Sequence, residues 1–64
     1  MSESFNVYAT IKHTDDQIEE RRLWLEGFTS REEAERFARL AVEHNPGVVL
    51  RAWVESARAK ESNQ

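Results

Sequence analysis

The chain has 64 residues and no cysteine, and its twelve acidic and nine basic residues give a formal net charge of −3 at pH 7. This length allows one domain with a small core, and the absence of cysteine excludes disulfides and thiolate metal sites as additional support. The negative charge excludes a surface that is basic as a whole, so a nucleic-acid role would need a local basic patch. We expect one domain over residues 1–64, ordered from about residue 4 to residue 56, with a flexible tail at 57–64.

The sequence predicts neither an export signal nor a membrane segment. No apolar run approaches the roughly 20 residues that cross a bilayer. The first four residues, Met-Ser-Glu-Ser, lack the basic and then apolar order of a signal peptide. We therefore expect no membrane contact and a cytoplasmic location.

Two strands are predicted in the first half of the chain. Apolar and polar residues alternate from Phe5 to Ile11, which is typical of a strand with one buried face. The short polar residues between His13 and Gln17 favour a turn. A second strand is predicted from Glu19 or Glu20 to Phe28, and so short a connection requires an antiparallel hairpin.

A helix is predicted next. Thr29 and Ser30 are each followed by a glutamate three residues later, which gives two overlapping capping boxes. The residues that recur at helical spacing on one side are Ala34, Phe37, Ala38, Ala41 and Val42. The helix should end near His44, with Asn45 in a left-handed cap conformation and Pro46 and Gly47 beyond it.

A third strand is predicted from Val48 to Glu55, because apolar residues again occupy alternate positions. The order is therefore β-β-α-β, an α+β fold with one helix packed on one face of a three-stranded, mostly antiparallel sheet. A helical crossover leaves the second and third strands parallel, most simply with the first strand between them, in the order 2-1-3. The order 1-2-3 is the alternative.

The predicted strands assign residues to two faces of the sheet. The helix should cover alternate residues of the first strand together with Leu23, Leu25, Val48, Leu50, Ala52 and Val54. The face turned away from the helix, called the open face below, should carry the candidate partner-binding residues. These are Tyr8, Arg22, Trp24, Phe28, Val49, Arg51 and Trp53.

An exposed cluster of aromatic and arginine residues is typical of an interaction surface. The leading hypothesis is a protein-binding module that forms a homodimer through this open face. A different protein partner, and single-stranded nucleic acid stacked on the rings, are alternatives. The small size also fits a phage-type or mobile-element-type regulator or inhibitor of a host protein. A structural alternative is that the tail or the arginine stems lie across the rings.

The polar residues do not form a recognisable catalytic site. His13, Asp15 and Asp16 could be drawn as a metal cluster, but such residues in a hairpin loop are usually turn formers. His44 is explained as a helix cap. With two glycines, the chain has no phosphate-binding loop. We therefore expect a non-enzymatic protein without metal or cofactor.

Overall fold

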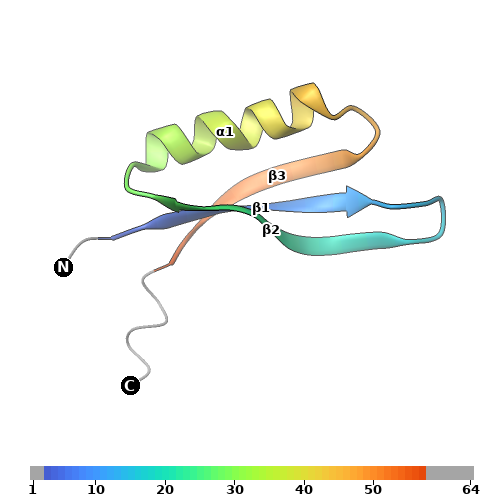
Figure 1. Ribbon diagram of the computed structural model, residues 1–64, viewed down its shortest axis with the longest axis horizontal. Helices are drawn as coiled ribbons and strands as arrows, with labels where there is room; N and C mark the ends of the chain where they lie inside the picture. The colour runs from blue at the N-terminus through green and yellow to red at the C-terminus, as the bar shows by residue number, and fades with distance from the viewer. Residues whose placement is uncertain (1–2, 58–64) are drawn as a thin grey trace, which may run out of the picture.

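The computed structural model describes residues 3–57, so the predicted flexible tail lies outside the described residues except for Ala57. The elements are β1 (Phe5–Lys12), β2 (Ile18–Phe28), α1 (Arg31–His44) and β3 (Val49–Ser56). The strand order is β2-β1-β3, and β1 pairs antiparallel with both neighbours. Figure 1 shows α1 as a second layer on one side of the strands. The predicted α+β fold and the 2-1-3 order are confirmed.

The predicted turn between the first two strands is confirmed. The amide of His13 donates to the carbonyl of Gln17 at 2.9 Å. The amide of Gln17 in turn lies 3.2 Å from the carbonyl of Thr14 and 3.1 Å from its hydroxyl. A short polar side chain thus adds a second acceptor to the main-chain one at the tip of the hairpin.

The helix is capped by side chains at both ends. Ser30 is the N-cap residue, and its hydroxyl accepts a hydrogen bond from the amide of Glu33 at 3.2 Å. The predicted left-handed conformation of Asn45 is wrong, because its φ is −135°. Its side-chain amide instead donates to the carbonyl of Ala41 at 2.9 Å, which satisfies a terminal acceptor. The left-handed turn is made by Gly47, with φ of 82°.

The core between α1 and the sheet is built from small side chains. Its buried apolar residues are Val7, Ala9, Ile11, Ala34, Ala38, Ala41 and Val49. The helical alanines allow the helix to approach the sheet closely, and α1 packs mainly on β3 and β1 and least on β2. Phe37, predicted on the apolar stripe of the helix, is 37% exposed and lies at the margin, with its ring centre 5.3 Å from that of Phe28.

The predicted register of β2 is wrong because this strand is bulged. It uses eleven residues to pair with the eight of β1, with irregularities at three places. At one of them Leu25 pairs with Val7 and Leu23 pairs with Tyr8, so Trp24 is an extra residue between two paired ones. Trp24 consequently packs against the core beneath the helix, while Leu23 and Leu25 are exposed.

Two further residues predicted on the open face, Phe28 and Val49, pack on the helix side of the sheet instead. Phe28 packs against the buried cluster of the helix face and stacks on Phe37. In β3, Val49 pairs with Ile11 and Arg51 with Thr10, so Leu50 is an extra residue at a bulge. Val49 is therefore 2% exposed and belongs to the core, whereas Leu50, predicted to be buried, is 44% exposed.

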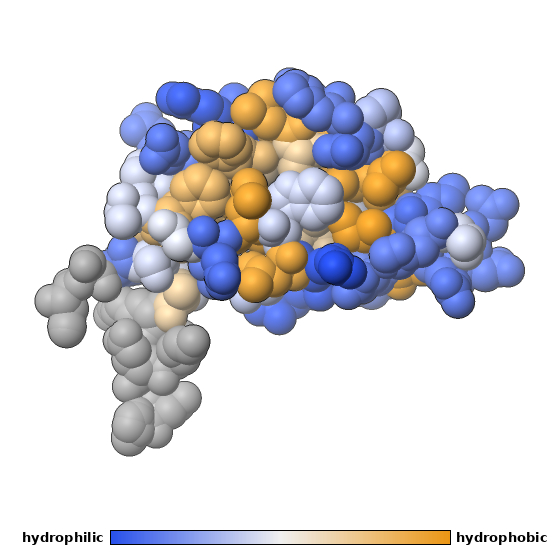
Figure 2. All heavy atoms as spheres, viewed as in Figure 1, coloured by the Kyte–Doolittle hydropathy of each residue, from blue (hydrophilic) through white to orange (hydrophobic). Residues whose placement is uncertain are grey.

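The remaining predicted core positions of β3 are divided by this bulge. Val48 is exposed and precedes the strand, so its predicted burial is wrong. Beyond the bulge the alternation is regular, and both Ala52 and Val54 pack against the buried clusters as predicted. Figure 2 shows the resulting surface, with hydrophobic residues gathered between the helix and the strands and hydrophilic residues at the hairpin end.

Side chains satisfy main-chain groups beside the bulges. The hydroxyl of Thr10 donates to the carbonyl of Glu20 at 2.8 Å. The side-chain oxygen of Asn6 accepts from the amide of Gly27 at 3.3 Å. Within residues 3–57, no buried side-chain polar atom lacks a partner. Side chains of β1 therefore supply hydrogen-bond partners for two main-chain groups of the irregular strand β2.

Candidate functional site

The open face carries an ion pair that spans the whole sheet. Arg21 of β2 donates to Glu55 of β3 through two bonds, Nε to Oε2 at 3.1 Å and Nη2 to Oε1 at 2.7 Å. The central strand lies between them, and the guanidinium carbon of Arg21 is 4.1 Å from the ring centre of Tyr8. This two-bond geometry is among the stronger forms of ion pair. Arg21 was not among the predicted site residues.

Trp53 and Arg51 extend this network along β3. The indole nitrogen of Trp53 donates to Oε2 of Glu55 at 2.8 Å, and the guanidinium of Arg51 lies 5.3 Å from the ring centre of Trp53. The pairing of Trp53 with Tyr8 confirms that these two rings share the open face. Each ring nevertheless has an arginine of the same chain beside it, as the structural alternative expects.

The network lowers the pKa of Glu55 from its ordinary value of 4.5 to about 2, chiefly through the hydrogen bonds from Arg21 and then from Trp53. A carboxyl group with a lowered pKa stabilises the fold above pH 4.5, and this stabilisation is lost as the pH falls towards 2. Glu55→Gln should therefore lower the melting temperature at pH 7 and have no effect near pH 2. Since both partners are partly exposed, the loss at pH 7 should be about 1 kcal/mol or less.

Thermal melts at pH 7, 4 and 2, at low protein concentration, measure this difference. The matched control is Glu26→Gln, since Glu26 makes no ion pair within the described residues. The control should track the native chain at each pH. A Glu55→Gln deficit that stays constant down to pH 2 would contradict the assignment.

A groove lies between α1 and the outer side of β3, with a volume of about 720 Å³. The helix contributes Arg31, Glu35, Ala38, Arg39, Val42 and Glu43, and the strand contributes Ala52, Trp53 and Val54. The groove therefore combines small apolar residues with charged side chains of alternating sign. No residue of its helical wall was among the predicted site residues.

The main chain of β3 presents hydrogen-bonding groups along this groove. The amide of Ala57 donates to the carbonyl of Ser4, so this pair is a hydrogen-bonded one. Hydrogen-bonded and non-hydrogen-bonded pairs alternate along an antiparallel ladder. Ala52 and Val54 therefore belong to non-hydrogen-bonded pairs, and their amides and carbonyls point away from β1. Within residues 3–57 no strand lies on that side of β3.

The two outer strands differ in how well they can accept another strand. β2 carries three irregularities and the charged run from Glu19 to Arg22, features that protect a sheet edge from pairing. β3 has one irregularity, between Thr10 and Ile11 of its partner strand, and is regular from Arg51 onwards. The β3 edge is therefore the better site for strand addition.

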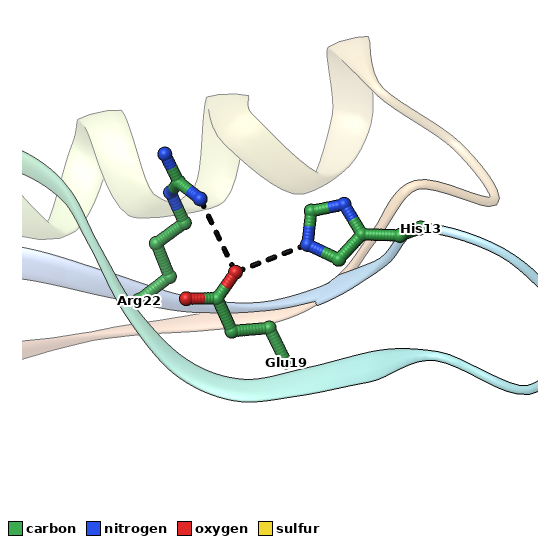
Figure 3. Close-up of polar contacts among 3 residues, drawn as sticks. All are labelled: His13, Glu19 and Arg22. Carbon is green, nitrogen blue, oxygen red and sulfur yellow. Dashed lines mark hydrogen bonds and ion pairs between the residues drawn. The ribbon is translucent and has the colours of Figure 1, made fainter.

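A second polar cluster lies at the hairpin end, shown in Figure 3. Oε1 of Glu19 is 3.0 Å from Nε2 of His13 and 3.2 Å from Nη1 of Arg22. The hydrogen bond from His13, and next that from Arg22, lower the pKa of Glu19. Arg22 pairs with Ala9, a helix-face residue, so its predicted place on the open face is wrong.

This cluster resembles ordinary surface ion pairing. The side chains are exposed by two fifths or more. His13 bonds to Glu19 across the hairpin, while Lys12 pairs with Asp15 at 3.4 Å. In residues 3–57 no group of three or more potential ligands is arranged to hold a metal ion.

Comparisons with protein families, with curated proteins and with solved structures found no match to this chain. Among the described residues, no helix has the length and apolar character needed to cross a membrane. Functional inference therefore depends on the site geometry, in which the β3 edge combines outward main-chain groups with an adjoining groove.

Proposed function

We propose that this chain is a non-enzymatic protein-interaction module that associates with a second copy of itself through the β3 edge and the adjoining groove. The observation that carries this proposal is the outward main chain of Ala52 and Val54 beside the groove. A strand added there gains main-chain hydrogen bonds, and the groove can receive its side chains. A small core also gains most from a partner that enlarges it.

The interface differs from the aromatic face expected from the sequence. Trp24 packs against the core, and the ring of Tyr8 is covered by the Arg21 guanidinium. For the same reason single-stranded nucleic acid is a weaker candidate, because stacking on Tyr8 would require Arg21 to leave Glu55. A different protein that adds a strand to β3 would be the main competitor of self-association.

Sedimentation equilibrium from about 1 to 100 µM should show a reversible dimer, a range that covers the affinities of modest interfaces. Hydrogen exchange should report the surface used. The amides of Ala52 and Val54 should gain protection with concentration, and by more than those of Arg51 and Trp53, which already face β1. A strict monomer over this range would overturn self-association.

A further inference from the structure

The open-face residues of β3 are chemically self-complementary. Arg51, Trp53 and Glu55 alternate along the strand as cation, ring and anion. If two β3 strands pair antiparallel with the two-fold axis at Trp53, Arg51 of each copy lies opposite Glu55 of the other. Opposite charges placed across a strand pair stabilise it. The two Trp53 residues then face each other at the centre.

The main chain restricts the possible registers. Outward-facing residues must pair with outward-facing residues, so a two-fold axis within the segment 52–54 can lie at Ala52, at Trp53 or at Val54. An axis at Ala52 would place Arg51 opposite Trp53, and an axis at Val54 would place Trp53 opposite Glu55. Of these three registers, the one centred on Trp53 alone pairs Arg51 with Glu55.

The helix wall of the groove has the same symmetry. Its charged residues Arg31, Glu35, Arg39 and Glu43 recur every four positions and alternate in sign. A second helix running in the opposite direction would place Arg31 opposite Glu43 and Glu35 opposite Arg39. Within residues 3–57, Arg39 and Glu43 make no ion pair. Both are therefore available to a second copy.

One axis satisfies both elements. The midpoint of the four charged helix residues is position 37, next to Ala38, which belongs to a buried cluster. Ala52 and Val54, which lie on either side of Trp53 along the strand, both pack against this cluster. The axis is perpendicular to the sheet, so it leaves both helices on the same face. Because α1 lies over both β3 and β1, the two helices would be about 8–10 Å apart, the usual distance for packed helices.

We infer that the partner at the β3 edge is a second copy in one defined arrangement, a continuous six-stranded sheet joined through β3 of each copy and centred on Trp53. The two α1 helices lie antiparallel over the joint and are held in register by the Arg31–Glu43 and Glu35–Arg39 pairs. This inference depends on the proposed self-association and adds its register.

Charge-reversed helices test this register without altering the core. One variant carries Glu35→Lys with Glu43→Lys, and the other carries Arg31→Glu with Arg39→Glu. Each alone would place like charges across the joint, so its self-association should weaken about tenfold or more. An equimolar mixture should regain association as a heterodimer. Circular dichroism should show that both variants keep the native fold, because all four side chains are exposed.

The matched control is Glu32→Lys with Glu33→Lys, which changes the net charge as much as Glu35→Lys with Glu43→Lys does, but away from the groove. It should dimerise like the native chain. If the native chain dimerises but each charge-reversed variant does so equally well alone, this register is wrong while the proposed function stands. A monomeric native chain would overturn both. A mixture that associates no better than its components would contradict the helix pairing.

Single cysteines give an independent readout, because the native chain has none. Opposed residues at the axis lie about 4.5 Å apart between Cα atoms, within reach of a disulfide. Trp53→Cys should therefore form a cross-linked dimer under mild oxidation. Arg51→Cys should not, because the two copies of that position are four residues out of register. Efficient cross-linking at Arg51 and none at Trp53 would overturn the inferred arrangement.

Discussion

Trp24→Ala should lower the free energy of unfolding by about 3 kcal/mol, near the lower end of the range for large aromatic residues because Trp24 is half-buried. The bulge in β2 directs this side chain against both buried clusters, where α1 covers the sheet least. Its removal would leave a void beside the buried clusters that small neighbours such as Ala9 cannot fill. In so small a domain this loss is a large share of the total stability.

Urea denaturation measures the loss, and the neighbouring Leu23→Ala provides the control. Leu23 is exposed opposite Tyr8, so its truncation should cost less than about 1 kcal/mol. The alternation of the sequence predicts the opposite result, a larger loss for Leu23→Ala than for Trp24→Ala, because it places Leu23 in the core. If Leu23→Ala were the more damaging change, the bulged register described for β2 would be incorrect.

Val49→Ala should cost about 2 kcal/mol, since Val49 is almost fully buried between β1 and the helix. Leu50→Ala removes a larger side chain but should cost less than about 1 kcal/mol, because the bulge leaves Leu50 exposed. Urea denaturation at two protein concentrations separates this core effect from stability gained by dimerisation. Equal losses for the two variants would contradict a bulge at Leu50.

The sequence predicts β1 and α1 well because each pattern is consistent with only one assignment of buried and exposed residues. Val7, Ala9 and Ile11 alternate without interruption, and the helix begins at a capping box and ends before Pro46. The sequence of β2 does not define one register. The residues from Glu19 to Arg22 are charged at odd and even positions alike, and the three residues that follow are all apolar. Both faces of β2 are therefore consistent with alternation, and only its pairing with β1 shows which residues face the helix.

The same limit applies to the candidate site. Tyr8, Arg51 and Trp53 belong to regularly alternating segments, and their predicted face is confirmed. The Arg21–Glu55 pair joins residues 34 positions apart on strands that are not adjacent, so no local pattern could indicate it. The groove depends on which edge of the sheet the helix covers. That choice comes from the packing of several alanines and not from any motif.

The strand order also determines when the domain can form during synthesis. β1 pairs with β3 from Phe5 with Ser56 onwards, so the two outermost segments of the described chain make a central ladder of the sheet. α1 packs mainly on that ladder and has little to bury against while only the hairpin exists. Closing so long a loop is entropically costly and slows folding. A nascent chain would therefore leave the ribosome with an unsupported helix, and cooperative folding would begin only after Ser56 emerges.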